Sequence, residues 1–219
     1  MSKIVLATGN QGKVKELASL LAEHNIEIIP QSHFNVPDVA ETGTTFVENA
    51  IIKARHAAKI TGLPAVADDS GLEVDALNGA PGVYSARYAG LPSNDILNTK
   101  KLLNALDGIP EKKRSARFHC LMIFMAHATD PSPLIGQGTW EGRIAFQEAG
   151  DNGFGYDPVF YSPEHQCVSA ELTATIKNRV SHRALALNQL MPQITDYFSK
   201  QTWGQSQKSI ASIFISPGV

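Results

Sequence analysis

The sequence has little cysteine, almost no excess of charge and no long hydrophobic run. Its 219 residues include two cysteines, Cys120 and Cys167, too few for a disulfide scaffold and without metal-ligand spacing. The 19 basic and 21 acidic residues give a net charge of -2, so no broad positive surface is available for nucleic acid or a membrane. No apolar run approaches the ~20 residues of a membrane span, and the start of the chain does not resemble a signal peptide. We therefore expect a cytoplasmic protein with neither a nucleic-acid nor a membrane partner.

The sequence also lacks a P-loop, although its N-terminal segment has a related plan. Residues 4–7 are apolar, residues 8–13 are polar with glycines at 9 and 12, and apolar positions 14, 17, 20 and 21 have helical spacing. A strand, loop and helix in this order direct backbone N–H groups at an anion, and Lys13 adds a cation. Val14 stands where a P-loop presents a hydroxyl to magnesium, which disfavours a kinase or GTPase. The segment predicts a phosphate site; the alternative is an ordinary turn with an exposed lysine.

The remainder of the chain predicts an α/β fold with a mixed sheet. Residues 26–30 read as a strand, Thr45 and Glu48 form a capping box for a helix ended by Gly62, and Ser181 is a predicted N-cap of another helix. Residues 117–126 are apolar on both faces and predict a central strand. Residues 134–138 and 143–146 predict a hairpin. Strands linked both by helices and by hairpins give a mixed sheet.

Two adjacent carboxylates follow the apolar segment 65–67. The pattern predicts a strand that ends at Asp68 and Asp69 and turns at Ser70 and Gly71. Neighbouring residues of a strand face opposite ways, so the two aspartates are not expected to share a role. One carboxylate beside a phosphate loop suits Mg²⁺, whereas the alternative is that both cap a turn. Lys53 on the preceding helix either is solvated or points into this site.

Two further segments suggest a binding site for a nucleobase. Phe154 lies between two glycines, with Asp157 close behind, which suits stacking on a base and hydrogen bonding to its edge; the alternative is a core phenylalanine beside a turn. His182 and Arg183 follow Ser181 in the first turn of a helix, where cations oppose the helix dipole. An anion or a carbonyl-bearing ligand explains that placement better than stability does.

These segments, in this order and spacing, resemble the inosine/xanthosine triphosphate pyrophosphatase family over roughly residues 3–196. The resemblance implies a long mixed central sheet flanked by helices, with two lobes and an active-site cleft between them. It also implies a homodimeric, Mg²⁺-dependent hydrolase that converts ITP, dITP and XTP to the monophosphate and pyrophosphate. One two-lobed domain is then expected over residues 1–198, and residues 199–219 form a loosely attached tail of unknown role.

The resemblance also implies a set of site residues. Those that bind the phosphates are Thr8, Gly9, Asn10, Gln11, Gly12 and Lys13. Asp69 holds Mg²⁺ and activates water, and Ser70 contacts the nucleotide. The residues of the purine pocket are Phe154, Gly155, Tyr156, Asp157, Lys177, His182 and Arg183. The family commonly has an acidic pair before Thr-Gly, but here it is Ala40-Glu41, so Glu41 is the remaining candidate for a second metal contact.

Two other functions stay open from the sequence alone. One is a nucleotide-binding regulator without turnover, for which the missing carboxylate at position 40 is the argument. The other is a related pyrophosphatase that acts on pyrimidine or modified nucleotides. Donors from His182 and Arg183 would accept a 6-oxo purine and exclude adenine, by up to about 10⁴-fold. Guanine shares the 6-oxo group, so its rejection depends on the 2-position.

Overall fold

The protein is built on one mixed sheet. The computed structural model describes residues 2–21 and 26–213, and within them seven strands have the order β2-β1-β3-β4-β5-β6-β7. These are β1 (Ser2–Leu6), β2 (Ile26–Pro30), β3 (Ala65–Val74), β4 (Ser115–Met125), β5 (Leu134–Ile144), β6 (Phe160–Ser162) and β7 (Cys167–Val168). β1 is parallel to β2 and β3, whereas the later neighbours are antiparallel. The predicted mixed sheet is confirmed.

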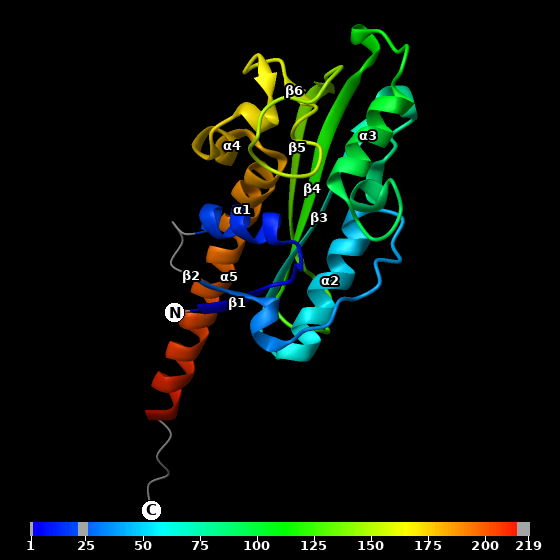
Figure 1. Ribbon diagram of the computed structural model, residues 1–219. Coiled ribbons are helices and arrows are strands. Elements are labelled where there is room, and N and C mark those ends of the chain that lie inside the picture. The colour runs from blue at the N-terminus through cyan, green and yellow to red at the C-terminus, as the bar shows by residue number, and fades with distance from the viewer. Residues whose placement is uncertain (1, 22–25, 214–219) are drawn as a thin grey trace, which may run out of the picture.

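Helices cover both faces of the sheet. They are α1 (Gln11–Leu21), α2 (Phe46–Thr61), α3 (Asp95–Ala105), α4 (Ala174–Val180) and α5 (His182–Ile213). Figure 1 shows α5 and α2 on opposite sides of the long strands. Ala65 and Ala67 pack with α2, whereas Val66 between them packs with α5. This alternation follows from the two-residue period of a strand, and it decides where Asp68 and Asp69 point.

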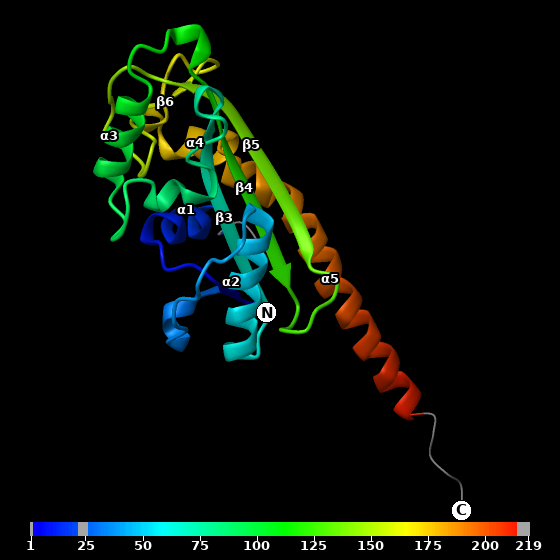
Figure 2. The ribbon, with the colours of Figure 1, turned by 90° about the vertical axis from the view of Figure 1, so that its right-hand side faces the viewer.

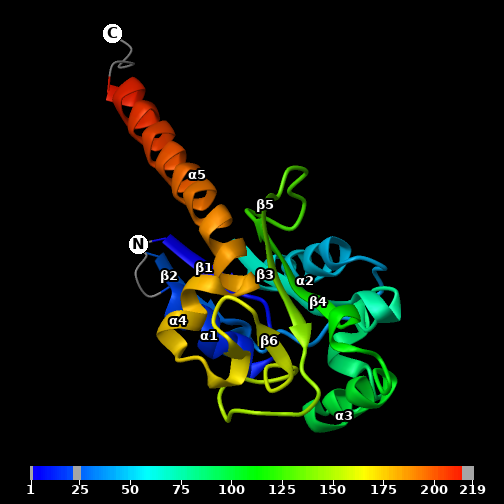
Figure 3. The same cartoon turned by 90° about the horizontal axis from the view of Figure 1, so that it is seen from above.

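The hydrophobic core is divided along the long strands. Two clusters lie around β1 and the first residues of β3, one against α5 and one against α2. A third cluster lies farther along β3 and β4, where Leu72 and Phe118 pack with Leu102 of α3. Figure 3, seen from above, shows α3 and α5 at different places along this sheet. Along β3, the polar residues Asp68 to Ser70 lie between residues of these clusters.

The helix ends agree with the capping residues read from the sequence. Thr45 accepts from the Glu48 backbone N–H, and the Glu48 carboxylate accepts from the Thr45 backbone N–H, so the predicted capping box of α2 is confirmed. Gly62 ends α2 in the left-handed region, at φ 68°. The Ser181 hydroxyl accepts from the Ala184 backbone N–H at 3.2 Å, which confirms the predicted start of α5.

The predicted end of the strand at Asp69 is wrong. β3 continues to Val74 because it pairs with β4 along its whole length, from Ala65 opposite Met125 to Val74 opposite Ala116. Gly71 is not a turn residue. A Cβ there would lie 2.4 Å from the carbonyl oxygen of Gly82, so the glycine allows the 3₁₀ helix η3 (Gly82–Arg87) to approach the strand.

The predicted hairpin between residues 134–138 and 143–146 is also wrong. β5 is one strand, and Trp140, at the expected turn, pairs with Phe118 of β4. Gly142 again serves close packing, since a Cβ there would lie 2.5 Å from the Tyr161 carbonyl oxygen. Both errors come from reading a glycine inside a strand as a turn.

The C-terminal helix is longer than the sequence suggested. Ser199 lies inside α5, which continues to Ile213, and Figure 2 shows its last turns extending away from the sheet. Phe214 and Ile215 of the expected apolar end lie outside the described residues. Across residues 2–21 and 26–213, none of the helices combines the length and apolarity that crossing a bilayer requires.

Candidate active site

The N-terminal loop forms one wall of a large cavity. It connects β1 to α1, and its turn is closed by side chains: Thr8 Oγ1 accepts from the Asn10 N–H at 3.2 Å, and Asn10 Oδ1 accepts from the Lys13 N–H at 3.1 Å. Thr8, Gly9, Asn10 and Lys13 line a cavity of about 730 Å³. Gln11 and Gly12 are not among the lining residues. Gly12 instead lies against Phe154, whose ring would be 2.8 Å from a Cβ at that position.

Asp68 and Asp69 have different partners because they face opposite sides of β3. Asp68 is fully buried and binds Lys13 at 2.8 Å and Arg183 at 3.5 Å. Burial alone would raise its pKa, but the charges of Lys13 and Arg183 outweigh this and hold the pKa of Asp68 far below its usual range. Asp69 faces α2, where Lys53 binds it at 2.8 Å and the Asn49 amide donates to it at 3.3 Å. Burial raises the pKa of Asp69, and Lys53 only partly offsets this.

Glu41 completes a carboxylate pair around Lys53. The Lys53 ammonium contacts Glu41 Oε1 at 2.9 Å and Asp69 Oδ1 at 2.8 Å, and Arg87 contacts Glu41 Oε2 at 3.3 Å. Burial opposes ionisation of Glu41, but the neighbouring Lys53 prevails and the pKa of Glu41 is lowered. Both carboxylates and Lys53 line the large cavity.

The donor set of this cavity fits Mg²⁺ only together with a phosphate ligand. Among the described residues, no group of three or more histidine, cysteine, aspartate or glutamate side chains could hold a metal ion. Mg²⁺, however, is usually bound through one or two carboxylates, waters and substrate phosphates. Glu41 and Asp69 meet that requirement, because both already converge on one cation, the ammonium of Lys53.

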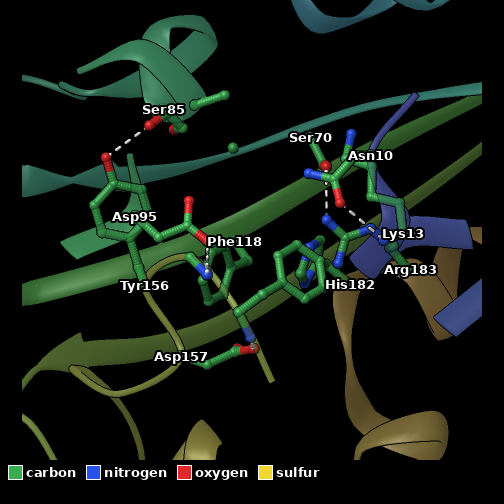
Figure 4. A pocket seen from close by; sticks show the side chains of 14 residues that line it. Asn10, Lys13, Ser70, Ser85, Asp95, Phe118, Tyr156, Asp157, His182 and Arg183 are labelled. Atoms are coloured by element: carbon green, nitrogen blue, oxygen red, sulfur yellow. Dashed lines mark hydrogen bonds between the residues drawn. The ribbon is translucent and has the colours of Figure 1, made fainter. Parts of the chain in front are cut away.

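A second cavity, of about 70 Å³, opens beside the first and is lined by aromatic rings, His182 and Arg183. His182 is only 2 % exposed and stacks on Phe118, with 4.6 Å between ring centroids and an interplanar angle of 13° (Figure 4). Neither ring nitrogen of His182 has a hydrogen-bond partner. Burial, together with the charges of Arg183 and Lys177, lowers the pKa of His182 well below its usual value. The cavity thus contains a neutral imidazole with unused hydrogen-bonding groups.

Arg183 is fixed in the wall of the same cavity. Glu16 of α1 binds it at 2.8 Å, and the guanidinium donates to Ser70 Oγ at 3.0 Å. Its carbon Cζ lies 5.0 Å from the centroid of the Phe154 ring. Nε of Arg183 is buried and makes no hydrogen bond, but it lies 3.5 Å from Asp68 Oδ2. The guanidinium is therefore held in place between Glu16, Ser70 and Asp68.

Asp157 and Lys177 support the turn that carries Phe154. Asp157 Oδ2 accepts from the Phe154 N–H at 2.9 Å and from Lys177 Nζ at 2.6 Å, and Oδ1 accepts from Ser169 Oγ at 2.7 Å. Both carboxylate oxygens are thus already bonded. Lys177 is not a lining residue of either cavity, whereas Phe154, Gly155, Tyr156 and Asp157 line the small one.

The two cavities form one continuous site. They share the lining residues Asn10, Lys13, Ser70 and Ala86. The N-terminal loop, the aspartates of β3 and the aromatic turn, all of which the sequence singled out, are therefore brought together. Sequence reasoning did not identify Glu16 or Asp95, and it left open whether Lys53 points inward. From sequence alone, a lysine on a helix such as Lys53 is expected to be exposed to solvent. Only the fold shows that it contacts the buried Asp69.

Comparison with known proteins agrees with this geometry. A model of the Ham1 family matches residues 4–193 of the chain. A dITP/XTP pyrophosphatase from Vibrio vulnificus is 61 % identical over 196 residues, covering 90 % of this chain and 98 % of the relative. The structure of a HAM1 protein from Coxiella burnetii superposes with a TM-score of 0.82 at 55 % identity, covering 90 % of this chain and 100 % of that one. The Staphylococcus aureus Ham1 protein gives a TM-score of 0.78 at 41 % identity, with 90 % and 100 % covered. With nearly its whole length matched in fold and sequence, this chain belongs to the Ham1 family.

Proposed function

We propose that this chain hydrolyses the non-canonical purine nucleoside triphosphates dITP, ITP, dXTP and XTP to the monophosphate and pyrophosphate. The observation that carries the proposal is a neutral, unpartnered His182 in a small aromatic cavity that adjoins a larger cavity lined by carboxylates and lysines. Relatives named dITP/XTP pyrophosphatase support the same substrate class. The activity removes deaminated purines from the nucleotide pool.

The large cavity is the site that we assign to the triphosphate. Backbone N–H groups at the start of α1, the Asn10 side chain and Lys13 bind the phosphate oxygens. Lys53 and Arg87, which also line this cavity, supply further positive charge. This charge is local, which a chain with a net charge of -2 needs if it is to bind a polyanion.

Asp69 is the residue that we assign to water activation. Asp69 lines the large cavity, and a carboxylate held there can accept a proton from water. Asp69 takes a proton from the water that attacks the α-phosphorus, and Lys53 holds the carboxylate in position. Glu41 and Asp69 would hold Mg²⁺, which when bound neutralises phosphate charge and orients the triphosphate.

The small cavity is the site that we assign to the base. Phe154 stacks on the purine, and His182 and Arg183, which line the same cavity, donate to its 6-oxo group. Adenine presents an amino donor there and leaves buried groups unpaired, which disfavours it by up to about 10⁴-fold. Gly155 and Tyr156 shape the wall, while Asp157 and Lys177 hold Phe154 in place.

The test is product formation with a panel of nucleotides. The protein is incubated with Mg²⁺ and dITP, XTP, dGTP, dATP or dTTP, and both products are quantified. Fast release of pyrophosphate from dITP and XTP is expected, and water labelled with oxygen-18 should place the label in the monophosphate. Binding of dITP without pyrophosphate would indicate a regulator, and faster turnover of dTTP would indicate a pyrimidine-directed enzyme. Chelation of Mg²⁺ should stop turnover.

We further propose that the protein acts as a homodimer in the cytoplasm, with no nucleic-acid or membrane partner. The family resemblance supports the dimer, and exposed Leu91, Ile96 and Leu97 offer apolar surface near the start of α3. The low net charge argues against a nucleic-acid partner. Sedimentation velocity gives the oligomeric state directly.

A further inference from the structure

Two side chains of α3 bind both backbone polar groups of Gly155. Asp95 Oδ2 accepts from the Gly155 N–H at 2.8 Å, and Thr99 Oγ1 donates to the Gly155 carbonyl oxygen at 3.3 Å. Asp95 and Thr99 are one helical turn apart, so they present adjacent groups to the same residue. Sixty and 56 positions of sequence separate them from Gly155. Such a contact fixes the relative position of two distant segments.

Gly155 connects the two aromatic residues of the small cavity, Phe154 and Tyr156. It has φ +62°, in the left-handed region, and its missing side chain leaves only backbone groups by which a neighbour can hold it. Asp157 holds the turn from the inner side, through the Phe154 N–H. Asp95 and Thr99 hold it from the side of α3. The backbone of Phe154 and Gly155 is therefore held both by Asp157 and by α3.

α3 also binds η3, which forms another wall of the cavity. Asn98 donates to the Ala86 carbonyl oxygen at 3.0 Å and accepts from the Ala89 N–H at 2.7 Å. The Tyr156 hydroxyl donates to the Ser85 carbonyl oxygen at 2.8 Å. One face of α3 therefore contacts the aromatic turn through Asp95 and Thr99 and contacts η3 through Asn98. The two walls are therefore connected both through this helix and directly, through the Tyr156–Ser85 hydrogen bond.

We propose that Asp95, assisted by Thr99, is a positioning residue for base recognition, which sets the aromatic turn at the separation from η3 that a purine requires. The inference rests on the proposed function of the small cavity. It differs from a purely structural role of Asp95 as an acidic residue in the first turn of α3, where it would act only on the helix dipole. A charged acceptor at 2.8 Å makes the Asp95 contact the stronger of the two.

Asp95→Ala tests the proposal. We expect the KM for dITP to rise about tenfold with kcat nearly unchanged, the pattern of a lost binding contact of this strength. Inhibition by inorganic tripolyphosphate, which has no base, should keep the wild-type inhibition constant. Asp95→Asn keeps an acceptor oxygen, so its KM for dITP should lie between those of Asp95→Ala and the wild type. Thr99→Val should also raise the KM for dITP, but by less than Asp95→Ala does. Thr99→Ser keeps the hydroxyl donor and should have the wild-type KM.

Asn94→Ala is the matched control. Asn94 caps the same helix through the Leu97 N–H at 3.0 Å, one residue before Asp95. The Asn94→Ala variant should have a lower thermal unfolding midpoint than the wild type, while its KM for dITP stays near the wild-type value. If Asn94→Ala raises KM as much as Asp95→Ala does, or if Asp95→Ala weakens tripolyphosphate inhibition equally, the positioning role is rejected.

Binding of IMP, measured by calorimetry, separates this inference from the proposed function. An absence of pyrophosphate release by the wild-type protein would reject the hydrolytic function, whereas the positioning role depends on affinity. Weaker IMP binding by Asp95→Ala than by wild type supports it whatever the turnover. Equal IMP affinity of the two proteins, or no IMP binding by either, overturns it.

Discussion

At the residue scale, the site depends on two adjacent aspartates with opposite environments. Asp68 faces Lys13 and Arg183 and stays ionised, so it serves as the fixed counter-charge that keeps these cations in the wall. Asp69 faces Lys53 and Asn49 of α2 and lines the large cavity, where we propose that it accepts a proton from water. The alternation of side chains along one strand is sufficient to give the two aspartates different partners.

The first prediction follows from that division. Asp69→Asn should lower kcat for dITP at least about 100-fold, because the proton acceptor is lost, while the affinity for dITP changes little. Steady-state pyrophosphate release and calorimetric binding measure the two quantities. Asp68→Asn is the matched comparison, and it should mainly weaken binding, since Lys13 and Arg183 lose their counter-charge. A near-normal kcat in Asp69→Asn would remove this residue from catalysis.

His182 gives a prediction about pH. Its buried ring resists protonation in the folded protein, whereas the unfolded chain protonates it below a pKa of ~6.5. The unfolded state then binds the additional proton, so the free energy of unfolding falls as pH drops below ~6.5. We expect the loss between pH 7.5 and 5.0 to be smaller in His182→Gln than in wild type, by up to about 2 kcal/mol. Urea titrations at the two pH values measure the free energy of unfolding. An equal decrease in wild type and His182→Gln would contradict the prediction.

At the element scale, α2 matters because it presents Asn49 and Lys53 to Asp69. Thr45→Ala removes one half of its capping box and should lower the free energy of unfolding by about 1 kcal/mol. Urea denaturation should show a lower midpoint with an unchanged m-value. Thr45→Ser keeps the hydroxyl and should remain close to wild type. Equal midpoints for the alanine and serine variants would mean that the cap contributes nothing to α2.

Sequence patterns predicted the elements well where a local signal was sufficient. The capping box of α2, the start of α5 and the central strand β4 all depend on residues within a few positions of one another. The extents of β3 and β5 depended instead on distant packing. Gly71 and Gly142 resemble turn residues in isolation, and only the approach of η3 and of Tyr161 explains them. The same holds for the site. Residues in local motifs could be identified from the sequence, whereas Glu16 and Asp95 could be identified only from the fold.

At the scale of the whole molecule, charge is balanced locally. Lys13, Lys53 and Arg183 each face a carboxylate from another element, so the cations that would meet a triphosphate are already positioned before it binds. Because these side chains are already ordered, binding a ligand costs little further conformational entropy. It also explains how a chain with a net charge of -2 offers a polyanion site.

The extent of the folded unit gives the last prediction. The family match ends at residue 193, but the next turns of α5 still contribute to the core. Ile194 is fully buried, and the rings of Tyr197 and Phe198 lie 5.2 and 5.9 Å from that of Phe124. A chain ending at residue 201 should therefore keep the stability and dITP turnover of the full chain, since its new helix end lies beyond Phe198.

A chain ending at residue 193 should lose about 3 to 5 kcal/mol of unfolding free energy, because it exposes the surface that Ile194 and the two rings cover. Urea denaturation of both truncated chains beside the full chain measures the difference. Equal stability of the shorter chain would place the end of the domain at the family boundary. Loss of stability or turnover in the longer one would instead make the residues after 201 part of the folded unit.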